Sequence, residues 1–97
     1  MQTYRIWEGE RTFLPGDDAS KFTIIEIIGE ELGWFEDVID GKTYYVYQTS
    51  EGEVVINIVE QNYGIGEPSR AVIYRFSSLE EAAQSEQRYA LEELRLI

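Results

Sequence analysis

The sequence contains neither cysteine nor histidine, and this double absence removes several chemistries at once. Without cysteine the chain has no disulfide framework, no thiolate nucleophile and no sulfur ligand for zinc. Without histidine it has no imidazole base, no serine–histidine–aspartate triad and no imidazole metal ligand. We therefore expect a protein that is not an enzyme and that uses neither a cofactor nor a metal.

Basic residues are also scarce. Eight Lys and Arg stand against 19 Asp and Glu, which gives a net charge of −11 at pH 7. A chain with this charge is repelled by phosphate backbones, so the sequence argues against direct nucleic-acid binding. The partner that the charge favours is a basic protein.

Long apolar segments are missing as well. The longest, Phe22–Gly29, is interrupted by Thr23 and Glu26 and is too short to span a bilayer. The first residues lack a basic segment followed by an apolar one, so we expect no signal peptide, no membrane contact and a cytoplasmic protein. A chain of 97 residues with 43% hydrophobic residues predicts a single domain over residues 1–97.

Turn-forming residues divide the chain into short segments with strand character. Asp40-Gly41 predicts a tight hairpin, and Gly29–Gly33 predicts a turn between two strands. The isoleucines of Phe22–Ile28 predict a strand that is buried on both faces and central in a sheet. The predicted strands are Thr3–Glu8, Phe22–Ile28, Trp34–Ile39, Thr43–Thr49, Glu53–Glu60 and Ala71–Phe76.

Ser78 and Glu81 have the spacing of a helix capping box. Together with the apolar positions that follow, they predict one C-terminal helix that starts at Ser78 and packs on the sheet. The predicted fold class is α+β, a small antiparallel sheet of five to six strands with a central meander and one helix on one face. Small bacterial and phage proteins, anti-defence proteins among them, share such a plan as an analogy of fold alone.

Acidic residues form the first group of candidate partner-binding residues. Alternate loops of a meander lie at the same end of a sheet, which predicts one acidic end with Glu30, Glu31, Glu51 and Glu53, and another with Asp37 and Asp40. Solvated surface charge is the ordinary role of such residues. A dense acidic surface can also imitate the phosphates of a nucleic acid. The spacing of the acids matches no calcium-binding loop.

Aromatic residues form the second group. The sequence concentrates them in the meander, and because strand side chains alternate, about half of them must face away from the side that packs under the helix. Exposed Tyr and Trp are typical of recognition surfaces, and the loop before the last strand carries one more. The candidates are Trp34, Tyr45, Tyr47 and Tyr63.

Two functions are compatible with these features. The first is a non-enzymatic acidic domain that binds a protein, an inhibitor that mimics nucleic-acid charge and blocks a nucleic-acid-binding protein. The alternative is a small accessory or regulatory subunit that forms a homodimer, or joins a complex, through the aromatic sheet face. Salt separates them, because charge steering is screened over about 8–10 Å at physiological ionic strength.

Overall fold

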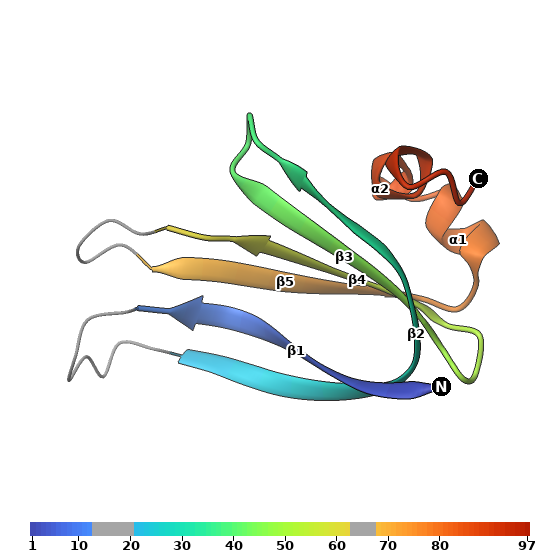
Figure 1. Cartoon of the computed structure of the whole chain (residues 1–97), viewed down its shortest axis with the longest axis horizontal. Coiled ribbons are helices and arrows are strands. Elements are labelled where there is room, and N and C mark those ends of the chain that lie inside the picture. Colours follow the sequence, from blue (N-terminus) through green and yellow to red (C-terminus); the bar gives the residue numbers. More distant parts are fainter. Residues whose placement is uncertain (13–20, 63–67) are drawn as a thin grey trace.

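Five antiparallel strands and two short helices make up the part of the chain that the computed structural model describes, residues 1–12, 21–62 and 68–97 (Figure 1). Neighbours in sequence are neighbours in the sheet, and the last strand returns to pair with the first, which closes a barrel. The elements are β1 (Gln2–Arg11), β2 (Lys21–Asp37), β3 (Lys42–Thr49), β4 (Val54–Glu60), β5 (Ser69–Phe76), α1 (Leu79–Ala83) and α2 (Arg88–Glu93).

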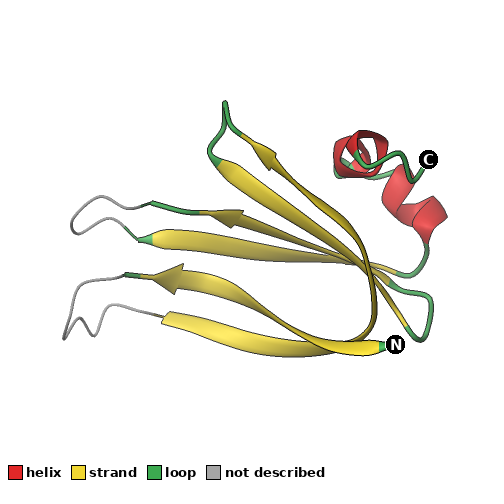
Figure 2. Ribbon diagram, in the orientation of Figure 1, coloured by secondary structure: helices red, strands yellow, loops and turns green. Residues whose placement is uncertain are grey.

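The prediction of an open sheet with one packed helix is wrong. The structure is a closed barrel that consists mostly of strands, with two short helices in place of the single helix. Figure 2 shows these helices together on one side of the strands. In the described ranges, no helix has both the length and the apolar character needed to cross a bilayer.

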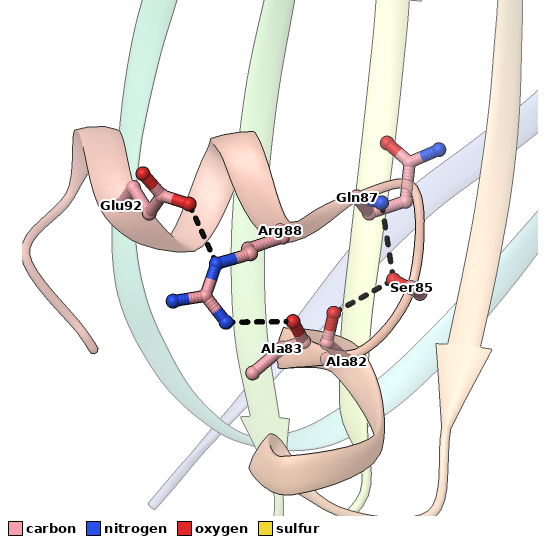
Figure 3. A network of polar contacts seen from close by, with 6 residues as sticks. All are labelled: Ala82, Ala83, Ser85, Gln87, Arg88 and Glu92. Atoms are coloured by element: carbon pink, nitrogen blue, oxygen red, sulfur yellow. Dashed lines mark hydrogen bonds and ion pairs between the residues drawn. The ribbon is translucent and has the colours of Figure 1, made fainter.

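The break between the two helices has a local polar cause (Figure 3). The Ser85 hydroxyl donates to the carbonyl of Ala82 (2.7 Å) and accepts from the backbone N–H of Gln87 (3.0 Å). The Arg88 guanidinium donates to the carbonyl of Ala83 (3.0 Å). The side chains of Ser85 and Arg88 thus occupy carbonyls at the end of α1 that the backbone of a further helical turn would otherwise bond. A serine that forms such local hydrogen bonds favours the end of a helix over its continuation.

The start of α1 agrees with the predicted cap. The Ser78 hydroxyl accepts from the N–H of Glu81 at 3.1 Å. The Glu81 carboxylate turns to Ser77, whose backbone N–H donates to it at 2.8 Å. The Ser77 hydroxyl also donates to this carboxylate. The hydrogen bond from the hydroxyl, followed by that from the backbone, lowers the pKa of Glu81.

Strand β2 is one continuous element where the sequence predicted two strands and a turn. Its first half pairs with β1 up to Gln2 opposite Gly29, and its second half pairs with β3 from Gly29 opposite Thr49 onward. Figure 1 shows β2 running along one edge and then sweeping round to the other side of the barrel. Because of this bend, the five-stranded barrel can close with β1 and β5 antiparallel.

Gly29 lies at the bend because no side chain fits there. A Cβ atom on Gly29 would lie 2.0 Å from the carbonyl oxygen of Gln48 and 2.7 Å from the Cα of Thr49. A glycine in a strand commonly marks such a close approach of two backbones. The predicted turn at this position is therefore a bend within a strand.

A β-bulge follows the bend. The pairing register with β3 shifts between Glu31 and Gly33, so Leu32 is an extra residue on β2. One extra residue exchanges the two faces of a strand. Ile27 accordingly faces the barrel interior, whereas Phe35 faces the helices.

Two apolar clusters result, one on each side of the sheet. The first fills the barrel and comprises Ile6, Ile27, Tyr47 and Val55, with Tyr4, Ile25, Tyr45 and Ile73 beside them. The second lies between the outer face of the sheet and the helices, with Val46, Val54, Ile56, Ala82, Ala90 and Leu91 at its centre. The helices therefore extend the core outward from β3 and β4.

The first half of β2 is not the doubly buried central strand that its isoleucines predicted. Ile27 is 3% exposed, but Ile24 is 46% and Ile28 is 55% exposed. Inward residues are covered by the barrel, whereas the outer face here is not covered by the helices. Isoleucine content alone did not reveal that only one face is buried.

Asn57 joins the two strands that close the barrel. β1 and β5 pair over only a short stretch, from Gly9 opposite Ala71 to Arg11 opposite Ser69. Asn57 is 3% exposed, and its side-chain nitrogen donates to the carbonyls of Trp7 and Val72, both at 3.0 Å. One amide on β4 thus reaches both strands.

We expect Asn57→Ala to weaken the closure, because it leaves two carbonyl oxygens without their donor. The free energy of unfolding in urea should fall by about 2–4 kcal/mol. The exposed Gln84→Ala is the control and should change it by less than about 0.5 kcal/mol. A loss below about 1 kcal/mol for Asn57→Ala would contradict this role of the amide.

Candidate protein-binding surface

The turn between β2 and β3 presents an unusual pair of apolar side chains to solvent. The backbone N–H of Asp40 donates to the Asp37 carboxylate at 3.3 Å, and Gly41 adopts a positive φ of 69° that a tight turn requires. This geometry leaves Val38 83% and Ile39 97% exposed. Two β-branched apolar residues therefore project between two carboxylates.

A set of stacked rings supports this turn. The ring of Phe35 on β2 stacks on Tyr44 of β3, with centroids 4.7 Å apart and planes 4° from parallel. Tyr89 of α2 meets both rings edge-on, at 5.8 and 6.1 Å. These ring contacts hold α2 against the hairpin, and Tyr89 is itself half exposed.

These elements form one surface, which we call the hairpin-tip surface. All of its residues except Val38 line an open hollow of about 440 Å³, and Val38 lines a neighbouring hollow together with Lys42. The hairpin-tip surface consists of Asp37, Val38, Ile39, Asp40, Tyr44 and Tyr89.

The potential at the hairpin-tip surface is negative. Burial, followed by the charges of Asp37 and Asp40, raises the pKa of Tyr44. Burial, followed by the charges of Glu93 and Asp37, raises the pKa of Tyr89. The nearby carboxylates disfavour ionisation of these two tyrosines. For the same reason, they would attract a cation placed over the two rings.

A groove continues from Tyr44 along the outer face of the sheet. It has a volume of about 430 Å³ and lies between β3–β5 and the connection of α1 to α2. Ile58, Val72 and Tyr74 contribute apolar atoms to it, and Val72 and Tyr74 are partly exposed. Its charged lining residues are Lys42, Glu60, Arg70 and Glu86.

The predicted acidic residues occupy opposite ends of the β2–β3 hairpin. Asp37 and Asp40 lie at its turn, whereas Glu30 and Glu31 lie at the bend, opposite Gln48 and Tyr47. The β3–β4 turn, which carries Glu51 and Glu53, is tied to the bend because the N–H of Ser50 donates to the carbonyl of Ile28 at 2.9 Å. The structure thus brings Glu30, Glu31, Glu51 and Glu53 to one end.

The predicted aromatic residues do not share one exposed face. Tyr47 is 7% exposed and packs inside the barrel, with its ring 5.0 Å from that of Tyr4. Tyr45 is half buried, and the exposed Trp34 stacks on it at 6.5 Å. The remaining candidate, Tyr63, lies outside the described residues.

Three residues of this surface, Val38, Ile39 and Tyr89, were not among the predicted partner-binding residues. Val38 and Ile39 end the predicted strand Trp34–Ile39, and Tyr89 lies within the segment of the predicted C-terminal helix. The sequence nevertheless carried a signal for the exposed pair. Two aspartates flank the two apolar residues and a glycine follows, a pattern that is typical of a turn whose central side chains face solvent. Nothing in the sequence indicated that α2 would return to this turn.

Within the described ranges, no group of three or more Asp and Glu side chains is arranged to hold a metal ion. A further hollow, of about 210 Å³, reaches the barrel interior and is lined by aromatic, aliphatic and amide side chains and by Arg5. Its lining includes no carboxylate. The described hollows thus have linings of mixed apolar and polar character.

Comparison with known proteins found no matching family model, no matching curated protein and no matching solved structure.

Burial makes Tyr47 a pH-sensitive residue. Burial, followed by the charges of Glu31 and Tyr45, raises the pKa of Tyr47 to about 12. The folded state therefore holds this proton more tightly than the unfolded chain, whose tyrosines titrate near 10. The resulting stability is fully present below about pH 10 and is lost as the pH rises towards about 12.

We expect Tyr47→Phe to remove this part of the alkaline destabilisation. Between pH 9 and 11, the free energy of unfolding of the wild type should fall by about 1–2 kcal/mol more than that of Tyr47→Phe. Urea denaturation at pH 9, 10 and 11 measures both slopes. Equal slopes would show that Tyr47 is not buried in the barrel.

Proposed function

We propose that the chain is a non-enzymatic domain that binds a basic protein through the hairpin-tip surface. The observation that supports this proposal is the placement of Val38 and Ile39, which are 83% and 97% exposed between two carboxylates. Apolar side chains in contact with water favour association by about 25 cal/mol per Å² that a partner covers. Flanking carboxylates add a preference for positive charge.

The chemistry of the surface suits an arginine or lysine side chain. A guanidinium can pack against the exposed part of the Tyr89 ring while it pairs with Asp37 or Asp40. Its methylene groups would then pack against Ile39. A partner with one such residue inside an apolar patch would use both properties of the surface.

The class of partner that we propose is a nucleic-acid-binding protein, which the chain would inhibit by imitating nucleic-acid charge. Asp37 and Asp40 flank the exposed apolar pair, and the charges of Asp37, Asp40 and Glu93 all act on the adjacent Tyr89. The net charge of −11 would speed the approach to a basic groove. We place this function in the cytoplasm, a reducing compartment that the absence of cysteine suits.

An accessory subunit that joins a complex through an aromatic face is a second candidate function. It is supported by Trp34, which is exposed and stacks on Tyr45. Tyr47 contributes nothing to such a face, since it lies in the barrel interior. In this case binding would depend on Trp34 and would change little with salt.

Charge reversal tests the proposal with a matched control. We expect Asp37→Lys with Asp40→Lys to reduce, by more than about tenfold, the basic proteins that the wild-type chain enriches from a lysate, read by quantitative mass spectrometry. Glu51→Lys with Glu53→Lys changes the net charge equally at the other end of the hairpin and should leave the enrichment almost unchanged.

Two results would contradict the hairpin-tip proposal. Equal losses in both double variants would mean that net charge alone attracts the partner. A loss in Glu51→Lys with Glu53→Lys alone would move recognition to the bend. Circular dichroism of each variant establishes that it is folded, and Trp34→Ala tests the second candidate in the same experiment.

A further inference from the structure

The outer face of β1 and of the first half of β2 is the part of the barrel that the helices leave bare. We call these two antiparallel segments, residues 2–11 and 21–28, the ribbon. Trp7, Phe22, Ile24 and Ile28 lie along its outer face, and the last three are exposed. In the described chain, neither helix contributes to a cluster with these side chains.

The ribbon also ends in a free strand edge. Among the described residues, 21–27 pair with β1 alone, because the carbonyl of Ile28 accepts from Ser50 and pairing with β3 begins at Gly29. Figure 1 shows this half of β2 along the outer rim, with β1 on its inner side. Such an edge offers unpaired backbone groups to a further strand, and the described residues of this edge contain no proline to block it.

The ribbon carries no net charge, in contrast to the chain as a whole. Residues 2–11 contain Arg5, Glu8, Glu10 and Arg11, so their charges cancel. Residues 21–28 contain Lys21 and Glu26, which cancel likewise, while the whole chain has a net charge of −11. Two copies of this acidic protein could therefore approach each other here without local like-charge repulsion.

Local contacts tie the charges of the ribbon to its own surface. The guanidinium of Arg11 lies over the rings of Trp7 and Phe22, at 5.3 and 4.4 Å from their centroids. The side chains of Arg5 and Glu26 pair across the two strands at 3.9 Å. The ribbon is thus an apolar, balanced surface and suits a partner with the same properties.

We propose that the ribbon is a homodimer interface, in which the free edge of β2 pairs antiparallel with the same edge of a second copy. A two-fold axis makes such a contact self-complementary. In an antiparallel pair, directly opposite residues point to the same face of the sheet, whereas neighbours along one strand alternate. The two-fold axis must therefore pass through a residue that lies opposite its own copy, and not between two residues. The register centred on Ile25 pairs residues 23–27 of the two copies and places Phe22 opposite Ile28 on the outer face, while Gly29 stays paired with β3.

This interface is independent of the hairpin-tip surface and leaves it open. Dimerisation would extend the β1–β2 half of the barrel into a sheet shared by two copies and cover Ile24 and Ile28. Because the contact is apolar and neutral, raising the salt concentration should not weaken it. Binding of a basic protein by the acidic end has the opposite salt dependence.

Sedimentation velocity over a range of protein concentrations tests the proposal. We expect a dimer of the wild-type chain. Ile24→Glu should weaken dimerisation by more than about tenfold, because the register places residue 24 opposite Glu26 of the second copy, where two like charges repel. Ile39→Glu adds the same charge at an exposed apolar residue outside the ribbon and should remain dimeric. Should Ile24→Glu fail to fold by circular dichroism, the more exposed Ile28→Glu, opposite Phe22, takes its place.

Crosslinking tests the register without relying on stability. The chain has no cysteine of its own, so Ile25→Cys introduces a single thiol that would meet its own copy at the axis. Mild oxidation should convert this variant into a disulfide-linked dimer, whereas Ile39→Cys should stay largely monomeric on a denaturing gel. A wild type that is monomeric at all concentrations, or a dimer that Ile24→Glu leaves intact, would overturn the proposal.

Discussion

The close approach of the β2 and β3 backbones at Gly29 is the constraint on which the rest of the structure depends. Five strands that alternate in direction would leave β1 and β5 parallel, yet these strands pair antiparallel. The antiparallel pairing is possible because β2 bends back at Gly29, so that its two halves run in opposite directions. At this bend Gly29 lies opposite Gln2 of β1 and opposite Thr49 of β3. The hydrogen bonds from Asn57 then hold the short seam between β1 and β5.

The same bend divides the surface of the protein into unlike parts. Beyond it, the bulge at Leu32 turns Phe35 toward the helices, so that the rings of Tyr44 and Tyr89 can gather behind the hairpin tip. Before it, β2 pairs on one side only and forms a bare, neutral ribbon with β1. The acidic hairpin tip and the ribbon therefore offer separate surfaces for a basic partner and for a second copy.

Local signals in the sequence predicted local structure well. The segments predicted over Thr43–Thr49 and Glu53–Glu60 agree with β3 and β4 to within one residue, and the Ser78 cap is present. Closure could not be predicted, because Gly29 has the same local signature in a turn and in a bent strand. The exposure of the aromatic candidates also depended on closure, since only the closed barrel places Tyr47 in its interior. Asp37 and Asp40 of the hairpin tip were predicted partner-binding residues, whereas its support by Tyr89 could not be predicted, because Tyr89 is far away in the sequence.

Nuclear Overhauser contacts between backbone protons test the central claim most directly. If β2 is one bent strand that closes the barrel, Gly29 should show contacts to both Gln2 and Thr49, and Gly9 should show contacts to Ala71. These pairs lie within about 4.5–5.5 Å between Cα atoms in antiparallel sheets, which is close enough for their protons to be detected. A Gly29 with contacts to only one neighbouring strand, together with no contact between Gly9 and Ala71, would contradict the account and indicate an open sheet.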